Sequence, residues 1–275
     1  NKIVRFSLPV VLMGLLQFLY SAADMIVAGK FAGSEALAAV GSTGALINLI
    51  VALFLGVSVG VSVAVAQHFG AREYEAVGKT VHTAMLIALL GGAGLGAFGF
   101  FMSRTFLVWM GSPADVIDQA ALYMRIFFLG LPMLMLYNFG ASVLRAVGDT
   151  KRPLYYLIIS SVVHIGLNLL LVIRYKMGVA GVALATVVSH ALSAALVINC
   201  LVHTPGPCRL DLKKLAVDWG KLGEMMRIGL PAGLQSSLFS VSNVLIQSSI
   251  NSFGSIAMAG NSAASNLENF IYISM

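Results

Sequence analysis

Apolar residues along this chain gather into long runs that polar and charged residues separate. An α-helix needs about 20 apolar residues to cross a hydrocarbon core about 30 Å thick, and most of these runs reach that length. The runs cover 3–28, 36–66, 77–102, 120–143, 154–173, 179–202, 226–250 and 257–275. The pattern predicts an all-α polytopic membrane protein with seven membrane-crossing helices and part of an eighth.

Composition and charge placement agree with a membrane protein. Hydrophobic residues make up 59% of the chain and charged residues only 10%, whereas charged residues are near 25% in soluble domains. The charges lie mostly between the apolar runs, so the net charge of +6 does not indicate binding to nucleic acid. Cys200 and Cys208 lack the spacing of metal ligands, and we expect neither a metal site nor a disulfide there.

The distribution of lysine and arginine predicts the orientation. If every run crosses the membrane, twelve of the seventeen basic residues fall on the side of the N-terminus. The other side holds Lys30, Arg104, Arg125, Arg174 and Lys176. Because basic residues concentrate on the cytoplasmic side, we expect a cytoplasmic N-terminus and a multi-pass protein of the inner or plasma membrane, in a bacterial cell.

An internal repeat divides the chain. Arg5, Leu8, Pro9 and Leu12 recur as Arg227, Leu230, Pro231 and Leu234. Parallel repeats of this kind build some secondary transporters. We therefore predict an N-lobe with transmembrane helices 1–6 in residues 1–204, a cytoplasmic linker at 205–225, and the start of a C-lobe at 226–275, with helix 7 and part of helix 8. Since Asn1 is not an initiator methionine and the last run stops within a helix, we expect a truncated two-lobe fold.

The first apolar run carries a single carboxylate, Asp24. A carboxylate within a membrane helix is energetically costly, and it usually faces a bundle interior or a water-filled cavity on an ion or substrate path. Gln17, Ser21 and Asp24 fall at i, i+4 and i+7, which predicts that they share one helix face. The alternative is that Asp24 lies at the outer headgroup level and is simply solvated, since Lys30 and Glu35 follow.

Several motifs carry a resemblance to a known family. They are NFGASVLRAVGDTKRP at 138–153, AQHFGARE at 66–73, GVAGVALAT at 178–186, and the repeated Leu-Pro pair near the start of each half. With these motifs in order along the whole chain, the sequence resembles the multidrug and toxic compound extrusion (MATE) family. The resemblance implies a twelve-helix fold, two lobes around a central cleft, and export driven by inward movement of H+ or Na+. It does not imply an enzyme.

The resemblance also implies a cation site in the N-lobe. In that family the site uses a first-helix aspartate, an Asn-x-x-x-Asp/Asn pair and a sixth-helix threonine, which correspond here to Asp24, the pair His164 and Asn168, and Thr186. A fourth-helix asparagine is similar to Asn138. His164 stands where the family usually has asparagine, which leaves three interpretations open: a proton relay with Asp24, Na+ held at Asp24 and Asn168, or a neutral histidine that packs between helices. We expect no cofactor besides the coupling ion and no other metal.

Further polar residues are candidates for the lining of the cleft. They are Gln17, Tyr20, Ser21, Gln235, Asn243, Gln247 and Glu268. The expected partners are small cationic substrates, the lipid bilayer and the remaining helices of the C-lobe. Of the other histidines, we expect His82 and His190 to be hydrogen-bonded within the bundle and His68 and His203 to be solvated.

Together these features predict a secondary active antiporter that exports organic cations, drugs or toxic metabolites in exchange for H+ or Na+, by alternating access with a cation site at Asp24. A flippase for lipid-linked saccharides or lipids, of the same two-lobe plan, is the alternative, although such a protein needs cationic residues in its cleft. An intramembrane enzyme is a weaker alternative, because no Gly-x-Ser-x-Gly or His-Glu-x-x-His motif occurs in the runs.

Overall fold

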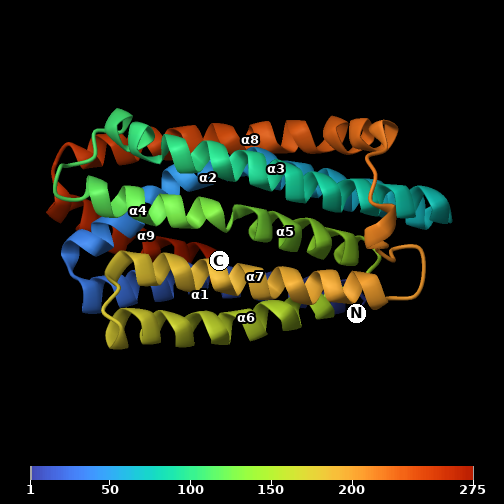
Figure 1. Cartoon of the computed structure of the whole chain (residues 1–275), viewed down its shortest axis with the longest axis horizontal. Coiled ribbons are helices and arrows are strands. Elements are labelled where there is room, and N and C mark those ends of the chain that lie inside the picture. The colour runs from blue at the N-terminus through green and yellow to red at the C-terminus, as the bar shows by residue number, and fades with distance from the viewer. Residues whose placement is uncertain (1, 275) are drawn as a thin grey trace.

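A computed structural model describes the backbone of residues 2–274 and the side chains of residues 8–265 and of Glu268. All regular elements in this range are helices, most of which run along the long axis of the molecule (Figure 1). In order they are α1 (Lys2–Val27), η1 (Ala28–Ala32), α2 (Ser34–Gly70), α3 (Tyr74–Trp109), α4 (Ile117–Leu129), α5 (Leu131–Ala146), α6 (Lys151–Leu169), η2 (Leu170–Arg174), α7 (Gly178–His203), η3 (Leu212–Lys214), α8 (Trp219–Asn251) and α9 (Ser255–Ser274). The predicted all-α membrane fold is confirmed.

Five segments in the described residues are long and apolar enough to cross a membrane: α1 with η1, α2, α3, α6 with η2, and α7. The predicted crossing at 120–143 is instead divided into α4 and α5, which meet at Gly130 with a bend of 49°. Pro132 lies in the first turn of α5, where its missing N–H and its ring favour a helix start over a continuous helix. A Cβ at position 130 would also lie 2.6 Å from the Val187 side chain, so glycine permits close packing at the bend.

α8 differs from the prediction for 226–250 in two ways. It begins at Trp219, within the predicted linker, where the Asp218 side chain accepts a hydrogen bond from Lys221 N at 3.0 Å and caps the helix. It is also too polar to be one of the five segments that could cross a membrane. The reason is its run of serine, asparagine and glutamine between 235 and 249. The division into 1–204, 205–225 and 226–275 stays a prediction.

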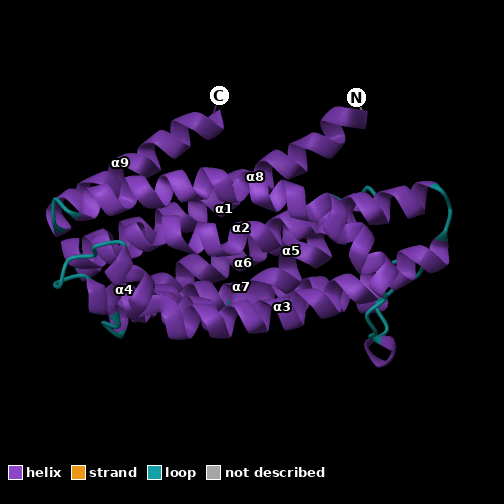
Figure 2. Ribbon diagram, turned by 90° about the horizontal axis from the view of Figure 1, so that it is seen from above, coloured by secondary structure: helices purple, strands orange, loops and turns teal. Residues whose placement is uncertain are grey.

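α2 lies at the centre of the bundle, in contact with α3, α4, α5, α7, α8 and α9. The beginning of α1 and the end of α9 diverge from the remaining helices on the same side of the molecule (Figure 2). One end of the bundle, on the right in Figure 1, holds the start of α1, the α2–α3 turn, the α5–α6 turn and the segment between α7 and α8. We call this the linker end.

The backbones of α2 and α8 approach closely along a stretch that we call the glycine seam, residues 53–60 of α2 and 225–233 of α8. A Cβ at Gly56 would lie 2.2 Å from Gly233 N and Cα, and a Cβ at Gly60 would lie 2.1 Å from Met225 O. Real Cβ atoms do not approach backbone this closely. The seam therefore depends on glycine, as is typical of helices packed within membranes.

The linker between α7 and α8 is bound to α3. His82 Nε2 accepts a hydrogen bond from Asp211 N at 3.0 Å, and Thr83 Oγ1 accepts one from Asp218 N at 3.0 Å. These bonds confirm the expectation that His82 is hydrogen-bonded in the bundle. Both residues lie at the linker end of α3, so the linker follows the bundle surface before α8 begins.

Candidate functional site

Four side chains predicted to form a cation site meet inside the bundle, where α1, α6 and α7 pack together. Asn168 Nδ2 donates a hydrogen bond to Asp24 Oδ1 at 2.6 Å, and Thr186 Oγ1 donates to Asp24 Oδ2 at 3.2 Å. His164 Nε2 lies 3.0 Å from Asp24 Oδ1 and 3.4 Å from Thr186 Oγ1. We call these four residues the Asp24 cluster.

The cluster is shielded from solvent. His164 and Asn168 are fully buried, and Asp24 and Thr186 are each 5% exposed. A solvated Asp24 at the headgroup level is therefore not what the structure shows. Because a buried carboxylate is stable only with hydrogen-bonding or charged partners, the three surrounding side chains explain how Asp24 is accommodated.

The local sequence explains how the cluster assembles. His164 and Asn168 are four residues apart on α6, so their side chains lie on the same face one turn apart, and Ser160 precedes them at the same spacing. All three are fully buried. Tyr20 and Asp24 have the same four-residue spacing on α1. Two short polar stripes, one on each helix, therefore face each other across the α1–α6 contact.

Tyr20 is the second polar residue of α1 in this interior. Its ring stacks on His164 at 4.2 Å between centroids with an interplanar angle of 18°, and it is also nearly parallel to the ring of His190, at 6.2 Å between centroids and 7°. Gln17 and Ser21 were predicted to share the face of Asp24, but both are exposed. A period of 3.6 residues also allows Tyr20 to share that face, and its larger ring is the side chain that the bundle buries.

Several polar atoms of this region have no hydrogen-bond partner among the described residues. Five buried side-chain atoms lack a partner in the part of the chain that the structure describes, and four of them lie in or beside the Asp24 cluster. These four are the Tyr20 hydroxyl, Ser160 Oγ, His164 Nδ1 and Asn168 Oδ1. Buried polar atoms in proteins are normally paired, either with protein or with ordered water. The chemistry of this region therefore suits a small polar ligand such as water, a proton carrier or a small cation. In the sequence, Ser160 enters only the weaker alternative of an intramembrane enzyme, as a possible partner of His164.

Asn138, the fifth predicted site residue, is not part of the cluster. Its Nδ2 donates a hydrogen bond to Leu134 O at 2.9 Å, one turn earlier in α5. The side chain is half-buried. The amide therefore satisfies a backbone carbonyl of its own helix.

The predicted cleft-lining residues of the second half lie in different surroundings. Gln235, Asn243 and Glu268 are exposed. Gln247 is buried, and its Nε2 donates to Asn251 Oδ1 at 2.9 Å, while Asn251 Nδ2 donates to Met110 O at 3.0 Å. Gln247 thus stabilises the packing of α8 against the end of α3. Its place in the lining of a cleft stays a prediction.

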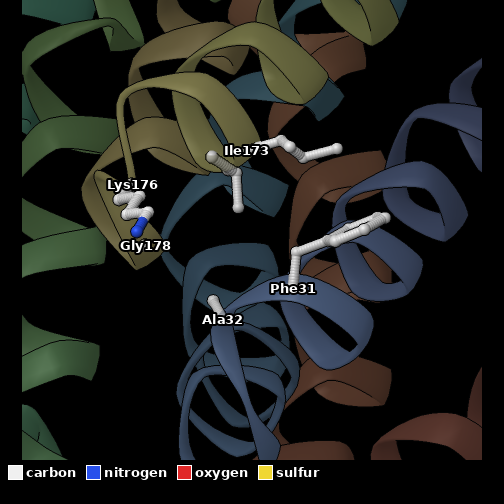
Figure 3. Close-up of a pocket in the computed structure, with 6 residues that line it drawn as sticks. Phe31, Ala32, Ile173, Lys176 and Gly178 are labelled. Carbon is white, nitrogen blue, oxygen red and sulfur yellow. The ribbon is translucent and has the colours of Figure 1, made fainter.

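Two π-helical segments lie within one turn of the cluster, η1 after Asp24 and η2 after Asn168. Short π-helical insertions of this kind are frequent at functional sites, and the hydrophobic pattern gave no sign of them. A cavity of about 360 Å³ lies between them, at the end of the bundle opposite the linker end. Phe31, Ala32, Val172, Ile173, Lys176 and Gly178 line it, and Figure 3 shows Phe31 and Lys176 on opposite sides.

Comparisons with known proteins agree with the resemblance in the motifs. The model of the family described as MatE matches residues 9–170. The "Probable multidrug resistance protein YoeA" of Bacillus subtilis is 30% identical over 97% of this chain. The "FAD transporter" of Shewanella oneidensis is 26% identical over 98%. A solved structure described as "MATE in the straight conformation" superposes with a TM-score of 0.84 and 26% identity over 99% of this chain and 61% of its own.

The match does not extend over the whole of these relatives. This chain covers 59% of the Bacillus protein and 61% of the Shewanella protein. The similarity therefore applies to about three fifths of the length of each relative.

Proposed function

Since this chain belongs to the MatE family, we propose that it forms part of a secondary active antiporter that exports organic cations, drugs or toxic metabolites. Inward movement of H+ or Na+ drives the export, and the Asp24 cluster is the coupling site. The carboxylate of Asp24 carries the proposal, because it is buried inside a membrane bundle with hydrogen bonds to residues of two other helices. Charged groups in such positions typically belong to ion or proton pathways.

The contacts of Asp24 favour H+ over Na+. The groups that face its two oxygens are the Asn168 amide nitrogen, the Thr186 hydroxyl and a ring nitrogen of His164. Sodium requires several oxygen ligands, so the Asn168 amide would have to turn its Oδ1 toward the carboxylate and His164 would have to withdraw. A proton needs no such rearrangement, since Asp24 Oδ1 and His164 Nε2 are already at hydrogen-bonding distance.

Addition of a proton to this pair changes how α1 is held. The ionised carboxylate accepts from Asn168 on α6 and from Thr186 on α7, and these charge-assisted bonds are about twice as strong as neutral ones. Once Asp24 is neutral, both bonds weaken, and α1 is less firmly held against α6 and α7. We propose that this change biases the two access states of the antiporter, which is the differential interaction that a coupled transporter requires.

The test is efflux of a cationic dye by the full-length protein in lipid vesicles, with pH and Na+ gradients imposed separately. Asp24→Asn keeps the shape of the side chain and removes its charge, so we expect membrane insertion without gradient-driven efflux. Asn138→Ala is the matched control, because it removes a polar side chain that is outside the cluster, and its efflux should remain normal. Normal efflux by Asp24→Asn would contradict the proposed coupling site.

A second variant separates the two ions. His164→Asn restores the residue usual in the family, and under proton coupling it should reduce efflux driven by the pH gradient at least tenfold. Efflux that follows Na+ and survives this substitution would assign the site to Na+ and leave His164 a packing role. Since a relative is named an FAD transporter, FAD is the next probe if the dye does not move under either gradient.

A further inference from the structure

Four charged or titratable side chains meet at the linker end of the glycine seam. His68 Nδ1, in the last turn of α2, lies 2.6 Å from Glu73 Oε2 in the turn that follows. On the other side of the ring, His68 Nε2 lies 3.0 Å from Glu224 Oε1 and 2.7 Å from Lys221 Nζ, both on α8. Lys221 Nζ also lies 3.0 Å from Glu224 Oε2. We call this group the His68 cluster.

The histidine is enclosed by the cluster. The His68 side chain is 13% exposed, compared with 57% for Glu73 and 30% for Glu224. The expectation that His68 is solvated is therefore wrong, and the reason is a tertiary contact with a helix more than 150 positions away in the chain. No local pattern around His68 signals that contact.

The hydrogen bonds that the two ring nitrogens of His68 can make depend on whether the ring is protonated. A neutral imidazole has one N–H and one acceptor, whereas the imidazolium has two N–H groups. With Nδ1 donating to Glu73, a neutral Nε2 accepts from the Lys221 ammonium. A protonated Nε2 instead donates to the Glu224 carboxylate. Lys221 and Glu224 are therefore alternative partners of the same atom, and the presence of the proton selects between them.

The protonation of His68 changes the charge balance of the cluster. With neutral His68, two carboxylates face one ammonium, and one negative charge is unbalanced. With protonated His68, each carboxylate has a cationic partner. Burial raises the pKa of the Glu224 carboxyl, but hydrogen bonds from Lys221 and His68 hold this pKa below its usual value. Glu224 is therefore ionised at neutral pH. On α3, Glu75 and Lys79 pair with each other at 2.8 Å.

We propose that the His68 cluster is a second proton-binding site, separate from the Asp24 cluster, and that proton binding there strengthens the attachment of α8 to α2. Proton binding replaces the bond from the Lys221 ammonium to a neutral ring by an ion pair between the imidazolium and the Glu224 carboxylate, so the link between the two helices then has two oppositely charged partners instead of one. Since histidine is the side chain whose charge ordinarily changes near neutral pH, closure of the linker end of the seam would respond to pH on that side of the membrane.

Because the His68 cluster lies between α2 and α8, a proton bound there affects whether these helices separate. α2 belongs to the predicted N-lobe and most of α8 to the predicted start of the C-lobe, and the two helices contact each other through the glycine seam, close to the His68 cluster. Any separation of these helices at the linker end must break the contacts of His68 with Lys221 and Glu224. The site therefore acts on the equilibrium between closed and open forms of this end, whichever ion drives transport.

The test measures the distance between α2 and α8 in the full-length protein in lipid vesicles. Spin labels are placed at the exposed positions Gln67 and Arg227, with the buried Cys200 and Cys208 replaced by alanine. Between pH 8 and pH 6 we expect the short-distance population to rise about two- to fivefold relative to the long-distance one, the range of a partly screened ion pair. His68→Gln should abolish this rise, and His203→Gln should not, because the His203 ring contacts its own helix.

Two further measurements do not depend on the folding of His68→Gln. Glu224→Gln keeps the shape of its side chain and should reduce the pH response. In the unsubstituted protein, the ¹⁵N signals of His68 should change from neutral to protonated imidazole between pH 8 and pH 5.5. A ring that stays neutral throughout, or a distance response that persists in His68→Gln, would overturn the proposal. None of these measurements needs substrate or a gradient, so their failure would leave the efflux test of the Asp24 cluster unaffected.

Discussion

Substitution of Gly56 by alanine tests the glycine seam directly. The added Cβ would lie 2.2 Å from Gly233 N and Cα and 2.7 Å from Gly229 O, all of them backbone atoms that cannot rotate away. Since carbon atoms pack at about 3.5–4.0 Å, α2 and α8 must separate locally by more than about 1 Å. Overpacking of this kind costs about 1–3 kcal/mol, and alanine recovers about 0.5–1 kcal/mol through its higher helix propensity. We expect a net loss of up to about 2.5 kcal/mol, with a central value of about 1 kcal/mol.

The control is Gly44→Ala in the same helix. A Cβ at position 44 has no neighbour within 4 Å, so this variant should gain only the helix propensity of alanine, about 0.5–1 kcal/mol. Thermal unfolding in detergent and the distance between α2 and α8 report on both variants. Gly56→Ala should unfold at a lower temperature than the unsubstituted protein with its helices further apart, and Gly44→Ala should not. A Gly56→Ala variant with the original distance and the thermal stability of Gly44→Ala would refute the close approach.

Two other substitutions test contacts described above. Tyr20→Phe should lower the free energy of unfolding by less than about 1 kcal/mol, because the hydroxyl has no partner among the described residues. Tyr20→Ala removes a buried ring and should lower it by about 3–5 kcal/mol. Equal thermal destabilisation by both variants would show that the hydroxyl is the important group. His82→Phe removes the acceptor for Asp211 N, and the loss of about 1 kcal/mol should raise tryptic cleavage of the linker about fivefold. His203→Phe should leave cleavage unchanged, and an equal rise there would exclude a specific anchor.

The sequence was sufficient for the membrane class and for the helices with strong apolar runs. α2, α3 and α7 include the predicted runs at 36–66, 77–102 and 179–202, because a run of this length has no other stable structure in a bilayer. The resemblance also identified Asp24, Asn168 and Thr186, which the structure brings together. Their role in coupling stays a prediction.

What the sequence did not reveal depends on contacts between distant segments. Whether Tyr20 or Ser21 lies beside Asp24 is decided by packing against α6, since both are compatible with helical periodicity. The enclosure of His68 requires α8, and the bonding of Gln247 depends on Asn251 and the end of α3. Pro132 was the only sign in the sequence of the break at Gly130. The angle of the break results from how α4 and α5 pack against other helices.

The polarity of α8 has a consequence for biosynthesis. A segment with so many serine, asparagine and glutamine side chains gains little from entering lipid by itself, since each unpaired polar group in hydrocarbon carries a cost. α2, by contrast, is strongly apolar and is translated well before α8. The glycine seam offers α8 a protein surface in place of lipid along residues 225–233. α2 is therefore available to pack against residues 225–233 when α8 is synthesised, whereas the polar run at 235–249 lies beyond the seam.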